Sequence, residues 1–184
     1  MADPKLLIAV ASTVIALVST AAVANAANTA KARPARQAIA DSSLALRIVS
    51  AVNGLRAENG LVGLSTSTAL TSTAANHSTS MGLRGYFSHE SADGSAFWKR
   101  LTRVYKPAKF QSWSVGENLL WSASSISPAG AISLWMASPE HRAVLLAPQW
   151  REIGLSVVHV PAAEGVFGGQ DVAIVTADFG VRKP

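Results

Sequence analysis

The 184-residue sequence contains no cysteine. This excludes disulfides, thiol catalysis, zinc ribbons and iron–sulfur ligation. Aromatic residues are also sparse at 7%, and charged residues make up 15%, whereas 49% of the chain is hydrophobic. The length favours one domain, because about 100 to 200 residues per domain is usual. A domain of this size buries enough surface to form a packed core without crosslinks.

Charge is absent from Leu6 to Val23, which lies between Lys5 and the small residues Ala24-Asn25-Ala26. This pattern predicts a secretory signal over residues 1–26, cut after Ala26. A membrane anchor is the alternative, since the run is just long enough to cross a bilayer. Ala, Ser and Thr dilute the run and favour cleavage, which leaves no transmembrane segment. An exported chain without cysteine indicates a secreted, extracellular or cell-envelope protein of a bacterium.

Acidic residues are the minority, and the formal net charge is +5. Residues 27–43 are small and basic and are predicted to form a flexible linker. Between Leu44 and Val181 there are ten Lys and Arg against nine Asp and Glu, so this part is nearly neutral. The excess positive charge therefore lies in the flanks. Nucleic acid is not expected as a partner, because it requires a basic face on the domain itself.

Hydrophobic spacing of 3.6 residues predicts a helix that starts at Asp41 or Ser42 and ends at Asn59-Gly60. A second helix is predicted over 67–81, with His77 on its inward face. Ser-Pro pairs at 127–128 and 138–139 open two more, because Pro is favoured at the first helical position and Ser caps it. The predicted helices are 42–59, 67–81, 95–104, 127–138 and 138–146.

Two strands are predicted at the end of the chain, over 153–160 and 172–179, where apolar residues alternate. The glycine-rich stretch 162–170 between them predicts an antiparallel hairpin. Residues 110–115 are expected to be extended and lead into Gly116-Glu117-Asn118. Helices followed by strands indicate an α+β domain, predicted over 44–181, with helices layered on an antiparallel sheet.

Three polar residues are candidates for chemistry. His77 is either a buried structural histidine or a functional one. His141 lies in the first turn of a helix capped by Ser138, where the positive helix end favours a neutral imidazole that can bind metal or act as a base. Glu117 enters a buried strand and needs hydrogen-bond donors or a cation as its partner.

His77, His141 and Glu117 suffice chemically for a divalent ion with open coordination positions. Their separations, 40 and 24 residues, match no local metal motif. A serine-hydrolase site is less well supported, because the chain has no G-x-S-x-G elbow and Ser138 is better explained as a helix cap.

Several motifs occur together and in order along residues 44–181. They are Gly85-Tyr86-Phe87-Ser88-His89, Gly116-Glu117-Asn118, Trp135-Met136-Ala137-Ser138-Pro139-Glu140-His141-Arg142 and Ala177-Asp178-Phe179-Gly180. In these motifs the chain resembles the CAP superfamily of SCP-like proteins, in its secreted bacterial form.

The resemblance implies a three-layer α-β-α sandwich with a cleft that holds two His and two acidic residues, and in several members a divalent ion such as zinc. His77, Glu117 and His141 match three of these positions. Ser138 occupies the position of the second acid, which weakens any metal site. His89 of the F-S-H segment is a candidate to approach the cleft as well.

These features lead to three alternative functions. The first is a monomeric extracellular module whose cleft binds a lipid, a glycan or another cell-wall component, with or without a metal. The second is a metal-dependent hydrolase, a peptidase or esterase, in which a metal-bound water attacks the substrate. In the third, His77, Glu117 and His141 form a structural hydrogen-bond network.

Overall fold

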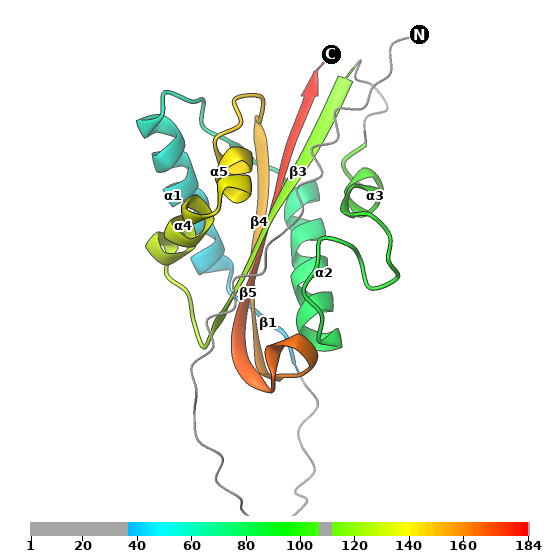
Figure 1. The fold of residues 1–184 in the computed structure, drawn as a ribbon. Coiled ribbons are helices and arrows are strands. Elements are labelled where there is room, and N and C mark those ends of the chain that lie inside the picture. The colour runs from blue at the N-terminus through cyan, green and yellow to red at the C-terminus, as the bar shows by residue number, and fades with distance from the viewer. Residues whose placement is uncertain (1–36, 107–111, 184) are drawn as a thin grey trace, which may run out of the picture.

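The computed structural model describes residues 37–106 and 112–183. The predicted signal, residues 27–36 of the predicted linker and residues 110–111 of the expected extended run lie outside these ranges. The described elements follow the chain in the order shown in Figure 1: β1 (Ile39–Ala40), α1 (Ser42–Glu58), β2 (Ser65–Thr66), α2 (Thr68–Arg84), α3 (Phe97–Thr102), β3 (Ser112–Ala123), α4 (Pro128–Ala137), α5 (Pro139–Leu145), β4 (Glu152–Ala163), a 3-10 turn (Gly165–Phe167) and β5 (Gln170–Lys183).

The sheet has the strand order β1-β4-β5-β3, and β2 pairs with β4 in parallel. The predicted hairpin between β4 and β5 is confirmed, and β3 pairs antiparallel with β5 along the whole length of β3. The last two strands extend beyond the predicted ranges. Buried residues occupy both faces of β5 from Val172 to Val181, so this part of the strand does not alternate between buried and exposed positions.

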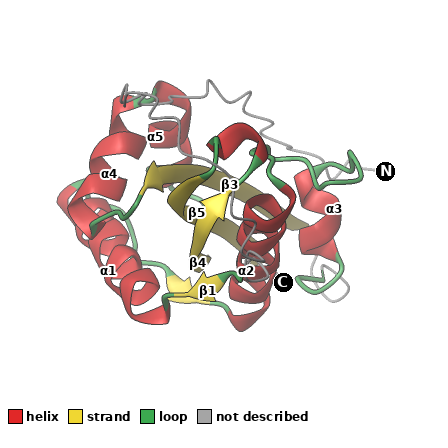
Figure 2. Ribbon diagram, turned by 90° about the horizontal axis from the view of Figure 1, so that it is seen from below, coloured by secondary structure: helices red, strands yellow, loops and turns green. Residues whose placement is uncertain are grey.

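Helices cover both faces of the sheet, as Figure 2 shows: α1, α4 and α5 lie on one side, and α2 and α3 on the other. Val175, Ala177 and Phe179 of β5 point toward α1 and α4 in the largest apolar cluster. Val172 and Ile174 point to the opposite face, toward Met81 of α2. The α-β-α sandwich expected from the sequence is therefore confirmed.

Helix α1 begins where its sequence predicts. The Asp41 side chain accepts a hydrogen bond from Leu44 N at 2.8 Å and so caps the first turn. Ile48 and Val52 are fully buried on the stripe that faces the sheet. Ile39–Ala40 pair with β4 just before this helix, so the last residues of the segment expected to be a linker form part of the sheet.

Helix α2 lies closely on β4 because of a glycine. A Cβ atom at Gly154 would overlap Thr71 N and the Leu70 carbonyl carbon. This approach allows the inward face of α2, which includes Thr73 and His77, to reach the side chains of the sheet. The helix continues to Arg84, three residues past its predicted end, and Gly85 closes it with a left-handed backbone (φ 73°).

The remaining differences from the predicted elements concern short segments. Helix α3 covers six residues instead of the predicted ten. Strands β1 and β2 have two residues each and offer no period to detect. Within residues 37–106 and 112–183, none of the helices combines the length and the apolarity that crossing a membrane requires.

Candidate functional site

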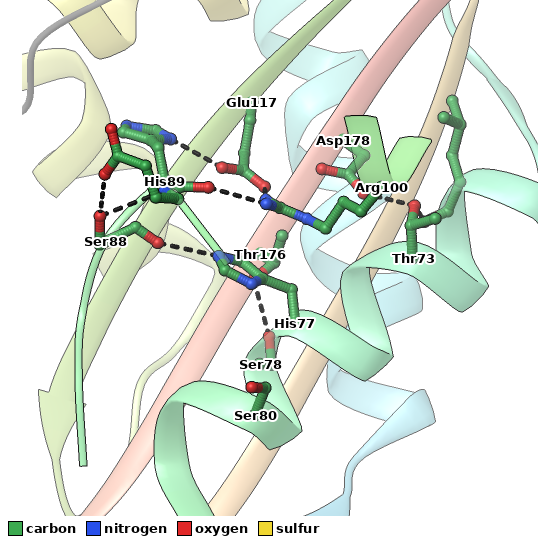
Figure 3. Close-up of polar contacts among 12 residues, drawn as sticks. Thr73, His77, Ser78, Ser80, Ser88, His89, Arg100, Glu117, Thr176 and Asp178 are labelled. Carbon is green, nitrogen blue, oxygen red and sulfur yellow. Dashed lines mark hydrogen bonds and ion pairs between the residues drawn. The ribbon is translucent and has the colours of Figure 1, made fainter. Parts of the chain in front are cut away.

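Glu117 of β3 is the centre of a polar cluster on the face of the sheet that α2 and α3 cover (Figure 3). Its side chain is fully buried. His89 Nδ1 lies 2.7 Å from Glu117 Oε1, and Arg100 Nη2 contacts Oε2. The expectation that this carboxylate needs donors or a cation is met by both kinds of partner. Burial raises the pKa of Glu117, but the hydrogen bond from His89 and the charge of Arg100 outweigh burial and leave it below its usual value.

Arg100 was not anticipated from the sequence. It follows Phe97 by one helical turn in α3, so its stem lies beside the apolar face formed by Phe97 and Leu101. Its Nη1 donates to the carbonyl of His89 at 2.7 Å, while Nη2 contacts Glu117. Arg100 thereby links strand β3 to the loop that contains His89.

Asp178 of β5 was also missed as a site residue. It lies directly opposite Glu117 in the β3–β5 register and is fully buried. Thr73 Oγ1 donates to its Oδ2 at 2.6 Å, while Oδ1 has no hydrogen-bond partner among the described residues. Burial and the nearby charge of Glu117 raise the pKa of Asp178 well above its usual value. A charged residue among the buried positions of a strand was the signal in the sequence.

His77 lies on the inward face of α2, as its spacing predicts, and is 3% exposed. Its Nε2 is 2.9 Å from the carbonyl of Ser88, which assigns Nε2 as the protonated nitrogen of the neutral ring. Burial lowers the pKa of His77 to about 4. His77 therefore ties helix α2 to the loop before His89 and is neutral at physiological pH.

His141 and Ser138 belong to the opposite layer of the sandwich. Ser138 caps α5 and its hydroxyl accepts from His141 N at 3.5 Å, as expected for a cap. Burial, followed by the charge of His89, lowers the pKa of His141. Asn118, the neighbour of Glu117, donates to the His141 carbonyl at 2.9 Å and anchors α5 to β3.

The structure thus brings His77, His89 and Glu117 into one cluster with Arg100 and Asp178. The charge of His89 acts on His141, so His141 lies near the cluster. The Ser138 hydroxyl accepts a hydrogen bond from His141 N in α5 and donates one to Glu140. Figure 3 shows the Arg100 side chain passing Asp178 to reach Glu117. The cluster contains two carboxyl groups and one guanidinium, which is always protonated.

The predicted metal ligands do not fit an ion as they are placed. Both oxygens of Glu117 are engaged by Arg100 and His89, and Nε2 of His77 is engaged by Ser88. Among the residues that the structure describes, no three His, Asp or Glu side chains are arranged to hold a metal ion.

The chain was compared with known families and structures. The model of the Cysteine-rich secretory protein family, CAP, matches residues 49–175. No protein of curated function matches the sequence.

Three solved bacterial structures share the fold. An extracellular protein with an SCP domain from Bacillus anthracis is 27% identical over 77% of this chain and 41% of its own, with a TM-score of 0.58. An outer surface protein of Borrelia burgdorferi is 20% identical over 80% of this chain and 98% of its own, with a TM-score of 0.57. A cysteine-rich secretory protein of Staphylococcus aureus is 18% identical over 74% and 38%, with a TM-score of 0.53. The chain thus spans less than half of the Bacillus and Staphylococcus proteins.

Proposed function

The chain belongs to the cysteine-rich secretory protein (CAP) family, and from this premise we propose that it is an extracellular binding module. Its similarity to proteins described as extracellular or as an outer surface protein supports the location. We further propose that its ligand contacts the surface next to Glu117 that the exposed parts of His89 and Arg100 form, with His141 close enough for the charge of His89 to lower its pKa.

The observation that carries this proposal is the exposure of the groups above Glu117. The Glu117 side chain is fully buried, whereas the side chains of His89 and Arg100 are 17% and 12% exposed. A buried carboxylate is costly unless it is paired, and such clusters concentrate at functional sites. His89 lies in a loop held on a rigid sheet, which is where binding residues are commonly found.

The chemistry of this surface favours an uncharged, hydroxyl-rich ligand. His141 is neutral at physiological pH, since burial lowers its pKa, and a neutral imidazole offers one donor and one acceptor. Arg100 has its charge matched by Glu117 and so does not require an anion. A glycan of the cell wall provides hydroxyl groups of this kind, and we propose it as the ligand class.

Sedimentation with purified peptidoglycan tests this function. We expect the chain to sediment with it, and His89→Ala or His141→Ala to weaken binding by about tenfold or more. His159→Ala is the matched control, because His159 of β4 pairs with Asp41 away from the cluster and is 30% exposed. Equal binding by all variants would refute the role of this surface. Binding to vesicles of phosphatidylglycerol, but not to peptidoglycan, would replace the glycan with a lipid.

The metal-dependent hydrolase stays a second prediction of the sequence. It predicts turnover of ester or peptide substrates that a chelator removes and zinc restores. The same preparation that binds peptidoglycan is assayed for turnover with zinc present. If there is no turnover, the hydrolase is refuted and the binding module is the one proposed function that is left.

A further inference from the structure

Glu117 and Asp178 place two carboxyl groups side by side in the interior of the domain. Their Cα positions are partners in the β3–β5 register, and both residues are buried on the face that α2 and α3 cover. Two like charges at such positions repel each other and lose their hydration. The arrangement requires a counter-charge, which a divalent ion would supply in a metal site, or a proton on one of the carboxyl groups.

Arg100 supplies a positive charge at this place. Its guanidinium contacts Glu117, and its charge also acts on Asp178 and lowers the pKa of that carboxyl against the larger effect of burial. A fully buried arginine, Arg56, donates to the backbone carbonyls of Val62, Leu145 and Ala147. An arginine can thus be buried in this fold without an acid, so the contact of Arg100 with Glu117, and its charge near Asp178, are specific to the cluster.

The position of Arg100 is fixed by the backbone. Nη1 donates to the His89 carbonyl, and the side chain is 12% exposed. Two buried atoms nevertheless lack hydrogen-bond partners among the described residues: Arg100 Nε and Asp178 Oδ1. The guanidinium therefore balances the charge of the carboxyl pair without saturating its oxygen atoms.

We propose that Arg100 is a built-in cation, whose guanidinium supplies beside Glu117 and Asp178 the positive charge that a divalent ion would otherwise supply. The native chain then binds no divalent ion at this cluster, and its ligand contacts the side chains directly. The inference does not depend on the proposed glycan ligand, since it concerns the cation that neutralises the carboxyl pair. It also makes Arg100, and not the loss of an acid at Ser138, the feature that excludes the metal.

Removing Arg100 should let the carboxyl groups rearrange around a metal ion. In Arg100→Ala the carboxyl pair loses its counter-charge and Glu117 Oε2 loses its partner, so carboxylate oxygens, with the His89 imidazole next to them, can turn toward zinc. Isothermal titration of zinc, with calcium and magnesium as further probes, into the chelator-treated full chain measures this. We expect one-to-one binding by Arg100→Ala, and either no detectable binding by the wild type or binding weaker by about tenfold or more.

Three variants serve as controls. Arg100→Lys keeps a cation and should behave as the wild type does. Arg103→Ala removes an exposed arginine next to α3 and should also bind no zinc. Adding Asp178→Asn to Arg100→Ala should abolish the gained binding, because one carboxylate is then lost.

The outcomes separate clearly. One-to-one zinc binding by the wild type that His77→Ala abolishes would overturn the proposal and establish the metal site that the family resemblance implies. A folded Arg100→Ala chain that binds no zinc would also overturn it. If Arg100→Ala unfolds, Arg100→Met keeps the apolar stem, and the thermal midpoint of either variant should rise on adding zinc. An unchanged midpoint in both would count against the built-in cation.

Discussion

Asp178 lies directly across the β3–β5 ladder from Glu117, and the two carboxyl groups share one buried environment. Their surroundings nevertheless move their pKa values in opposite directions. His89 and Arg100 hold Glu117 ionised, whereas burial and the charge of Glu117 favour the protonated form of Asp178. A protonated Asp178 can donate to Glu117 and so gives Oδ1 the partner that it otherwise lacks.

This relationship predicts that Asp178→Asn stabilises the domain at neutral pH. Asparagine has nearly the same shape as aspartic acid. Its amide can accept a hydrogen bond from Thr73 and donate one to Glu117, and this donation does not require a protonated carboxyl group. Because the folded-state pKa of Asp178 is raised, the stability it contributes is present at low pH and is lost as the pH rises through that pKa. We expect a gain of about 1 kcal/mol near pH 7 and less near pH 4, measured by urea unfolding. Glu58→Gln, an exposed position at the end of α1, is the control, and an equal gain there would contradict the prediction.

Glu117→Gln should destabilise the domain by about 3 kcal/mol, because it leaves the largely covered Arg100, 12% exposed, without its carboxylate. The matched control is Glu152→Gln. Glu152 is also held by an arginine, with Arg182 Nη2 at 2.9 Å, but the pair is 23% and 30% exposed, and we expect a loss of about 1 kcal/mol or less. Chemical unfolding of both variants measures the difference. Equal losses of unfolding free energy would show that burial does not make Glu117 more important for stability than Glu152.

How much of this could be predicted from the sequence depends on the kind of signal. Helix α1 has a clear hydrophobic period, and the β4–β5 hairpin has a glycine-rich turn between two apolar runs. Both were predicted correctly, and the motifs indicated the family and its sandwich. The inward face of His77 and the cap at Ser138 follow from local spacing, and the structure confirms both.

The partners of Glu117 could not be predicted in the same way. Arg100 is 17 residues away in sequence and Asp178 is further still, so their meeting depends on strand register and on how α3 packs. Local pattern contains no information on such pairing. The neutral state of His141 was expected from the helix end, but burial is the main reason for its lowered pKa.

Two glycine substitutions should have opposite effects on stability, because only one of the two glycines lies where α2 closely approaches β4. Gly154→Ala should destabilise the domain by about 3 kcal/mol or prevent folding, because its Cβ would overlap the backbone of α2 at Leu70 and Thr71. Gly54→Ala in α1 is the control, since nothing lies within 4 Å of a Cβ there, and it should stabilise by about 0.5 to 1 kcal/mol. Thermal unfolding of both variants measures this. A well-folded Gly154→Ala chain would show that α2 can withdraw from the sheet.

The buried His77 predicts a loss of stability at acidic pH. Its pKa is about 4 in the folded chain against 6.5 for an unperturbed histidine, and the cause is burial. The unfolded chain therefore takes up a proton first, so the contribution of His77 to stability is full above pH 6.5 and falls as the pH drops toward 4, by about 3 kcal/mol. His77→Gln should remove this contribution and leave the fall that His141 causes and the opposing rise from the raised pKa of Asp178, whereas His159→Gln should retain it. Urea unfolding at a series of pH values measures the slopes. The same slope in His77→Gln as in the wild type would mean that another group carries the pH dependence.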